Sequence, residues 1–90
     1  MPFADTSIEL PCADLDANSD PDTLYQTGLA YSLGDGVSLD LVQAHKWFNL
    51  AASKGVEAAK DLRKEMADQM SSDEVREAQK AAREWLRLAN

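Results

Sequence analysis

Side chains that could perform acid–base or nucleophilic chemistry are few and scattered in this chain of 90 residues. The sequence has a single histidine, His45, and a single cysteine, Cys12. Catalysis by general acids, bases or nucleophiles needs several such groups held together, and no Ser/His/Asp set stands at a helical offset from His45. His45 also falls on the polar strip of a strongly apolar segment. It is therefore predicted to be a surface histidine, and a small enzyme is the disfavoured alternative for this chain.

Two short stretches resemble ligand-binding motifs without completing them. Oxygen-bearing side chains alternate, as at the start of a calcium loop, at Asp14, Asp16, Asn18 and Asp20. Such a loop needs glycine at its sixth place and glutamate at its twelfth, where this chain has Ser19 and Tyr25. The glycine-rich turn 34–36 lacks the Lys-Ser/Thr of a phosphate-binding loop, and one histidine with one cysteine cannot build a zinc site. We therefore expect no metal ion, no cofactor and no small-molecule substrate.

Basic residues recur on one face of the last predicted helix. At about 100° per residue, three of them lie within about 40° of the first, which is Arg76. This basic strip consists of Arg76, Lys80, Arg83 and Arg87. One interpretation is a solvated face with ion pairs along the helix to the neighbouring acidic residues. The other is a docking strip for an acidic partner or for the acidic N-terminal segment, with an anionic membrane or nucleic acid as the least favoured ligand.

Charge is distributed unevenly along the chain. Residues 1–22 contain six acidic residues and no Lys or Arg, whereas residues 23–90 contain ten acidic and nine basic residues. An acidic chain is a poor default binder of nucleic acid. No apolar run is long enough to span a bilayer, the first residues do not resemble a signal peptide, and one cysteine fits a reducing compartment. These features predict a cytoplasmic protein.

Helix start and stop signals divide the rest of the chain into four helices. Asp20-Pro21 opens the first, which runs to about Leu33. Asp40 is the predicted N-cap of the second and Gly55 its C-terminal stop. The third begins near Val56, and an S-x-x-E capping box, residues 71–74, begins the fourth. Strand signals are absent. We predict an irregular acidic segment over 1–20 and a helical domain over 21–90.

The helix between Asp40 and Gly55 is the centre of this domain. Apolar side chains cover most of its circumference and leave only a narrow polar strip, which consists of His45, Lys46, Asn49 and Ser53. A helix this apolar must be covered on several sides. Gly28 in the preceding helix costs roughly 1 kcal/mol against alanine, which predicts that another helix approaches it closely.

Twelve positions in order carry a resemblance to a known family. They are Gly28, Tyr31, Gly34, Gly36, Val37, Asp40, Ala44, Trp47, Phe48, Ala51, Ala52 and Gly55. This pattern resembles the Sel-one-like repeat, a relative of the tetratricopeptide repeat, and spans about residues 23–55. Residues 56–86 resemble the divergent helix pair that closes bacterial members. Thr23 and Thr27 depart from the usual alanine and leucine at the outer edge of the first helix.

The resemblance implies an all-α, TPR-like solenoid fragment of antiparallel helix pairs. It also implies a scaffold or adaptor for protein complexes, here an accessory subunit of a larger bacterial assembly. Because stacked pairs usually number three or more, the N-terminal segment, a second copy or a partner should cover an exposed side. We expect partner contacts on the face of the first and third helices, at Tyr25, Leu29, Ser32 and Arg63.

Overall fold

The computed structural model describes residues 20–89, and its side chains through residue 88. It contains four α-helices: α2 (Pro21–Leu33), α3 (Leu41–Ser53), α4 (Glu57–Asp68) and α5 (Ser72–Ala89). The described part of the chain has no strand, so the predicted all-α class is confirmed. Predictions about residues 1–19, including the irregular acidic segment, lie outside the described residues.

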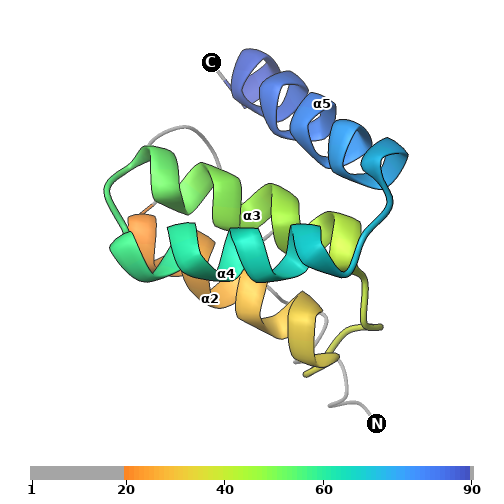
Figure 1. Cartoon of the computed structure of the whole chain (residues 1–90). Coiled ribbons are helices and arrows are strands. Elements are labelled where there is room, and N and C mark those ends of the chain that lie inside the picture. The colour runs from red at the N-terminus through yellow and green to blue at the C-terminus, as the bar shows by residue number, and fades with distance from the viewer. Residues whose placement is uncertain (1–19, 90) are drawn as a thin grey trace, which may run out of the picture.

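Helix α3 is the centre of the molecule, as its composition predicts. The other three helices all pack against it (Figure 1). Seven of its thirteen residues are buried: Ala44, His45, Trp47, Phe48, Leu50, Ala51 and Ala52. Because neighbours surround α3 on several sides, almost its whole circumference is shielded from water.

Most of the predicted helix boundaries are confirmed by their hydrogen bonds and dihedral angles. Asp40 accepts a hydrogen bond from the Gln43 amide at 3.1 Å, and Gly55 follows α3 with a φ of 98°. The capping box of α5 is reciprocal, since the Glu74 amide donates to the Ser71 hydroxyl at 3.1 Å and the Ser71 amide donates to the Glu74 carboxylate at 2.9 Å.

The start of α2 differs from the prediction in one detail. Asp20 holds the N-cap position, but its side chain makes no capping hydrogen bond. The amide of Thr23 donates instead to the backbone carbonyl of Asp20 at 2.9 Å. The helix therefore starts with Pro21 at its first position and with backbone hydrogen bonds to the Asp20 carbonyl.

The α2–α3 contact is close because α2 presents a glycine there. A Cβ atom at Gly28 would lie 2.7 Å from two carbons of the Phe48 ring, which confirms the predicted close approach. Tyr25 packs against the same ring with centroids 5.9 Å apart. Thr27 is not at an outer edge as expected: it is 1% exposed, and its hydroxyl donates to the Thr23 carbonyl at 2.8 Å. That bond lets a polar side chain replace leucine in the core.

Helix α5 does not form a closed antiparallel pair with α4. It packs chiefly against α3 and lies apart from α4 in Figure 1. Trp85 meets Trp47 edge to face at 5.3 Å between ring centroids, and Ala78 and Ala82 are buried. The apolar stripe of α4, which includes Ala59 and Met66, belongs to the core cluster around α3. Helices α4 and α5 therefore both pack their apolar faces against α3, which leaves a space between α4 and α5.

Candidate functional site

His45 is buried and does not lie on the surface as the sequence predicts. It is 3% exposed, because the polar strip of α3 faces the junction with α4 and α5. Its Nδ1 atom is buried without a hydrogen-bond partner in the described structure. Burial, and then the neighbouring Arg63 guanidinium, lower the pKa of His45 below its ordinary value of 6.5, so the ring is neutral at pH 7. A buried polar atom without a hydrogen-bond partner reduces the stability of the folded state by about 1–3 kcal/mol, and such atoms are rare in folded proteins.

A polar pocket of about 510 Å³ explains the surroundings of His45. It lies where three helices meet, and we call it the α3–α4–α5 pocket. Helix α3 contributes His45 and Asn49, while α5 contributes Val75 and Gln79. The α4 lining consists of Lys60, Arg63, Lys64 and Ala67. No acidic residue lines the pocket within the described chain, so the lining itself carries a net positive charge.

One hydrogen bond fixes the guanidinium at the pocket. Arg63 Nη1 donates to Asn49 Oδ1 at 2.7 Å, which joins α4 to α3. This bond uses one of the five N–H donors of arginine. The Lys60 Nζ atom lies 3.3 Å from a carboxylate oxygen of Glu57 on the same helix. Because Glu57 offsets its charge, Lys60 contributes less positive charge to the pocket than Arg63 does.

Partner residues predicted on α2 share one side of that helix but are partly used by the chain itself. Tyr25 and Leu29 are half-buried and pack against the core cluster. The Ser32 hydroxyl donates to the Leu29 carbonyl at 2.9 Å. Arg63 was expected on the same face, but it lines the α3–α4–α5 pocket, whose lining contains no α2 residue. The structure thus divides these residues between two surfaces.

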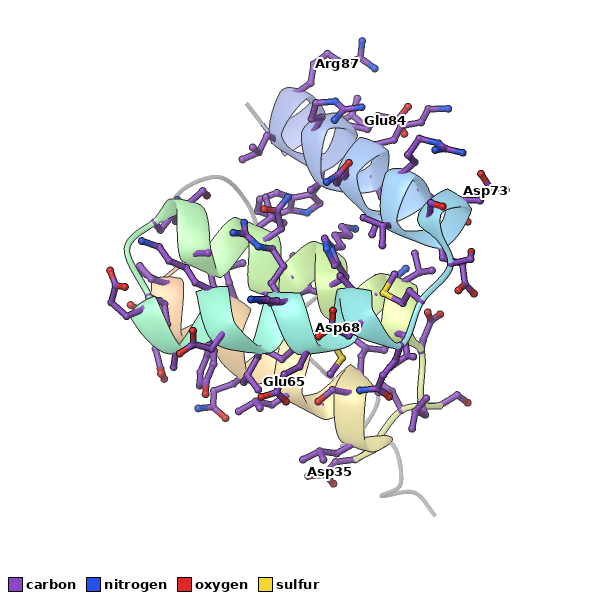
Figure 2. The ribbon with its side chains drawn as sticks, viewed as in Figure 1. Asp35, Glu65, Asp68, Asp73, Glu84 and Arg87 are labelled. Carbon is purple, nitrogen blue, oxygen red and sulfur yellow. The ribbon has the colours of Figure 1, made fainter. Side chains whose placement is uncertain are left out.

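Figure 2 shows Glu84 and Arg87 on the side of α5 that is turned away from α3, and all four residues of the basic strip are exposed. Arg76 pairs with Asp73, and Lys80 lies 4.0 Å from Glu84. Lys80, Arg83, Glu84 and Arg87 line a shallow hollow of about 290 Å³. The ion pairs expected of a solvated face are present, while docking on this strip stays a prediction.

Neither a metal cluster nor a membrane-spanning helix is found in the described residues. Within residues 20–89, no group of three or more His, Cys, Asp or Glu side chains is placed to hold a metal ion. Most of the calcium-like stretch, residues 14–19, lies outside this range. None of the described helices combines the length and the apolar character needed to cross a bilayer.

Helices that pack closely through a small residue and an aromatic ring, as α2 and α3 do at Gly28 and Phe48, are typical of a helical repeat protein. A family model described as Sel1 repeat matches residues 21–56 and 66–90. These segments cover more than half of the chain, which therefore belongs to the Sel1 repeat family. The predicted resemblance and the TPR-like solenoid class are confirmed. Searches of curated proteins and of solved structures found no significant match.

Family membership supports a broad class of function. Sel1 repeats are generally protein–protein interaction modules and are typically not enzymes. The first match contains α2 and α3, and the second contains α5 with the end of α4. The chain therefore combines one full repeat with a shorter second match, as the sequence pattern indicates.

Sequence reasoning missed the α3–α4–α5 pocket. Its signals were the i,i+4 pair His45 and Asn49 on α3 and the basic cluster at residues 60, 63 and 64 on α4. Each looks like an ordinary solvated patch on its own helix. The two groups of residues come together only because α4 and α5 both pack against α3 while α5 stays apart from α4.

Proposed function

We propose that this chain is a protein–protein interaction module that serves as an accessory subunit of a larger assembly. One observation carries the proposal. Among the described helices α2 packs chiefly against α3 alone, although repeat pairs gain stability from neighbours on both sides. The open flank of α2 can therefore accept another helical surface.

The exposed residues of α2 support this assignment. Leu33 is 71% exposed and continues the row formed by Tyr25 and Leu29 at helical spacing. Leu39, in the turn that follows α2, is 60% exposed. A phenol ring, two leucines and a serine hydroxyl offer the mixture of apolar anchors and polar groups that protein interfaces use. We infer that Tyr25, Leu29 and Ser32 contact the partner there.

Two exposed leucines on different helices allow a matched test. Leu33→Asp places a charge on the open flank of α2, and Leu88→Asp places the same charge on α5, where Leu88 is 80% exposed. Neither change touches the buried core. In a pull-down with tagged full-length protein, we expect Leu33→Asp to lose the co-purifying partner and Leu88→Asp to retain it. Identical sets of captured proteins for both variants would contradict the proposed interface.

Setting and oligomeric state belong to the same proposal. A single cysteine fits a reducing compartment, so we place the module in the cytoplasm. The resemblance of residues 56–86 to the closing segment of bacterial members is our reason for proposing a bacterial assembly. A second copy of this chain is an admissible partner for α2. Sedimentation of the pure protein at several concentrations distinguishes self-association from binding to a different protein.

A second candidate function is the binding of acidic surfaces through the basic strip. It is favoured by the hollow that Lys80, Arg83 and Arg87 line on the outer side of α5. Exposed ion pairs contribute only about 0–1 kcal/mol each and are screened by salt. Strong salt dependence of partner binding would favour this strip, and weak dependence would favour the flank of α2. Nucleic acid is the less favoured ligand, because the whole chain has a net charge of −7.

A further inference from the structure

The α3–α4–α5 pocket combines a concave shape with one sign of charge. Its volume is about 510 Å³, its three cationic side chains all come from α4, and no acidic side chain lines it within the described residues. Lys60 and Lys64 are exposed, whereas His45 is buried, so the imidazole lies deepest. A negatively charged group that enters would pass the lysines and meet Arg63 and His45.

His45 lies beside these charged side chains and would report the charge of a group that enters the pocket. Its side chain is more than nine-tenths buried, it lines the pocket, and its Nδ1 atom has no hydrogen-bond partner. Histidine in a packed helical core ordinarily finds a partner for each buried nitrogen. Nδ1 has no exposed surface, so a charged ligand in the pocket would act on the imidazole through its charge and not through a hydrogen bond to Nδ1.

The structure assigns this pocket as a binding site for the carboxylate of an Asp or Glu side chain within an acidic segment of a partner protein. The assignment rests on the proposed function and names the chemistry of that partner. Arg63 would pair with the carboxylate through the donors that its bond to Asn49 leaves over, and the negative charge would favour protonation of the neighbouring His45 ring.

Composition of the walls favours a peptide over a nucleic acid. Asn49 and Gln79 offer amide groups that both donate and accept, which suits the backbone of an extended peptide. Ala67 and Val75 add apolar surface beside them. A nucleic-acid site would be expected to carry aromatic platforms and a wider basic surface, and the lining contains no aromatic residue in the part of the chain described.

The single histidine makes the test direct. The imidazole carbon–proton signals of His45 are the only ones of their kind in the NMR spectrum of the full chain. We would titrate the protein with acetyl-hexaglutamate amide and, as the neutral match, acetyl-hexaglutamine amide. The hexaglutamate peptide should shift the His45 signals saturably and raise the pKa of His45, since an opposite charge favours the protonated ring. The hexaglutamine peptide should do neither.

Two arginine variants locate the site. Arg63→Gln should weaken the hexaglutamate titration of His45 about tenfold or more, because a charge-assisted pair is lost. Arg83→Gln removes the same charge from the outer side of α5 and should leave that titration unchanged. Arg63→Gln also breaks the bond to Asn49, so Lys64→Gln, an exposed change at the pocket mouth, serves as the second variant and should weaken the titration to a smaller degree.

Every outcome decides the assignment. It is overturned if the two peptides act alike, if Arg83→Gln weakens the His45 titration as much as Arg63→Gln, or if oligouridylate shifts His45 at lower concentrations than hexaglutamate. If a partner is captured in the pull-down but His45 does not respond to hexaglutamate, the assignment of the pocket is rejected and the proposed interaction module is retained. If His45 responds to hexaglutamate but no partner is captured in the pull-down, the assignment of the pocket is retained and the proposed interface on α2 is rejected.

Discussion

His45 shows how much a single residue depends on its neighbours. The sequence places it on a polar strip, and in the structure it is the one residue of that strip that is buried, at the junction of α3 with α4 and α5. Its pKa falls because burial disfavours the charged ring and because Arg63 adds a like charge. The same two causes determine how protonation of this residue affects stability.

The free energy of unfolding should fall as pH decreases across the titration of His45. Its folded pKa lies below the 6.5 of the unfolded chain, so the unfolded state binds more protons between these two values. The contribution of the neutral His45 ring to the free energy of unfolding is complete above about pH 6.5, and it is lost as pH falls through the folded pKa of His45. Urea unfolding at pH 7.5 and 5.5 measures the loss. His45→Gln is the control, and an equal loss in that variant would assign the effect to other groups.

Gly28 is a second residue whose identity the packing determines. Gly28→Ala would improve intrinsic helix propensity by roughly 1 kcal/mol, yet its Cβ would meet the Phe48 ring at 2.7 Å. We expect the clash to exceed the propensity gain, so that Gly28→Ala destabilises by about 1–3 kcal/mol and Gly28→Val by more. Thermal melts of each variant, alone and with Phe48→Leu, check this. A more stable Gly28→Ala protein would contradict close packing.

At the scale of elements, α3 determines the arrangement of the other helices. Trp47 is 2% exposed and touches Trp85, so it lies in the contact between α3 and α5. Trp47→Ala should destabilise the protein by about 3–5 kcal/mol, a large share of the stability of a small domain. Trp85→Ala should cost less, since Trp85 is only half-buried. A Trp47→Ala melt within a few degrees of wild type would show that α3 is not the centre of the core.

The basic strip of α5 and the acidic residues 1–22 form a pair of opposite charge, six negative against four positive. We expect residues 1–19 to compete with an acidic partner for this strip. Their deletion should hardly change the melting temperature, because the buried core cluster runs from Leu24 to Ala82. The deletion should strengthen the binding of hexaglutamate to the basic strip, most at low salt, as measured by the shifts of the Arg83 and Arg87 amide signals in NMR titrations. Equal binding with and without residues 1–19 at every ionic strength would end this hypothesis.

At the scale of the whole molecule, the sequence predicted what local patterns encode. Capping by Asp40 and Ser71, the glycine at position 55 and the central helix all follow from residue type and spacing. The α3–α4–α5 pocket could not be predicted in this way, because it depends on α5 packing against α3 and standing apart from α4. The burial of His45 was missed for the same reason: a helical wheel shows which residues share a face and does not show what covers it.

The attachment of α5 to a single helix has a consequence for local opening. Helix α5 follows a short turn after α4 and is held chiefly by its seam with α3, so it can open while α2, α3 and α4 stay folded. Such opening removes Val75 and Gln79 from the wall of the α3–α4–α5 pocket. A ligand that touches Arg63 on α4 and Gln79 on α5 would therefore hold the last helix closed, and the amide protons of α5 would exchange with solvent more slowly.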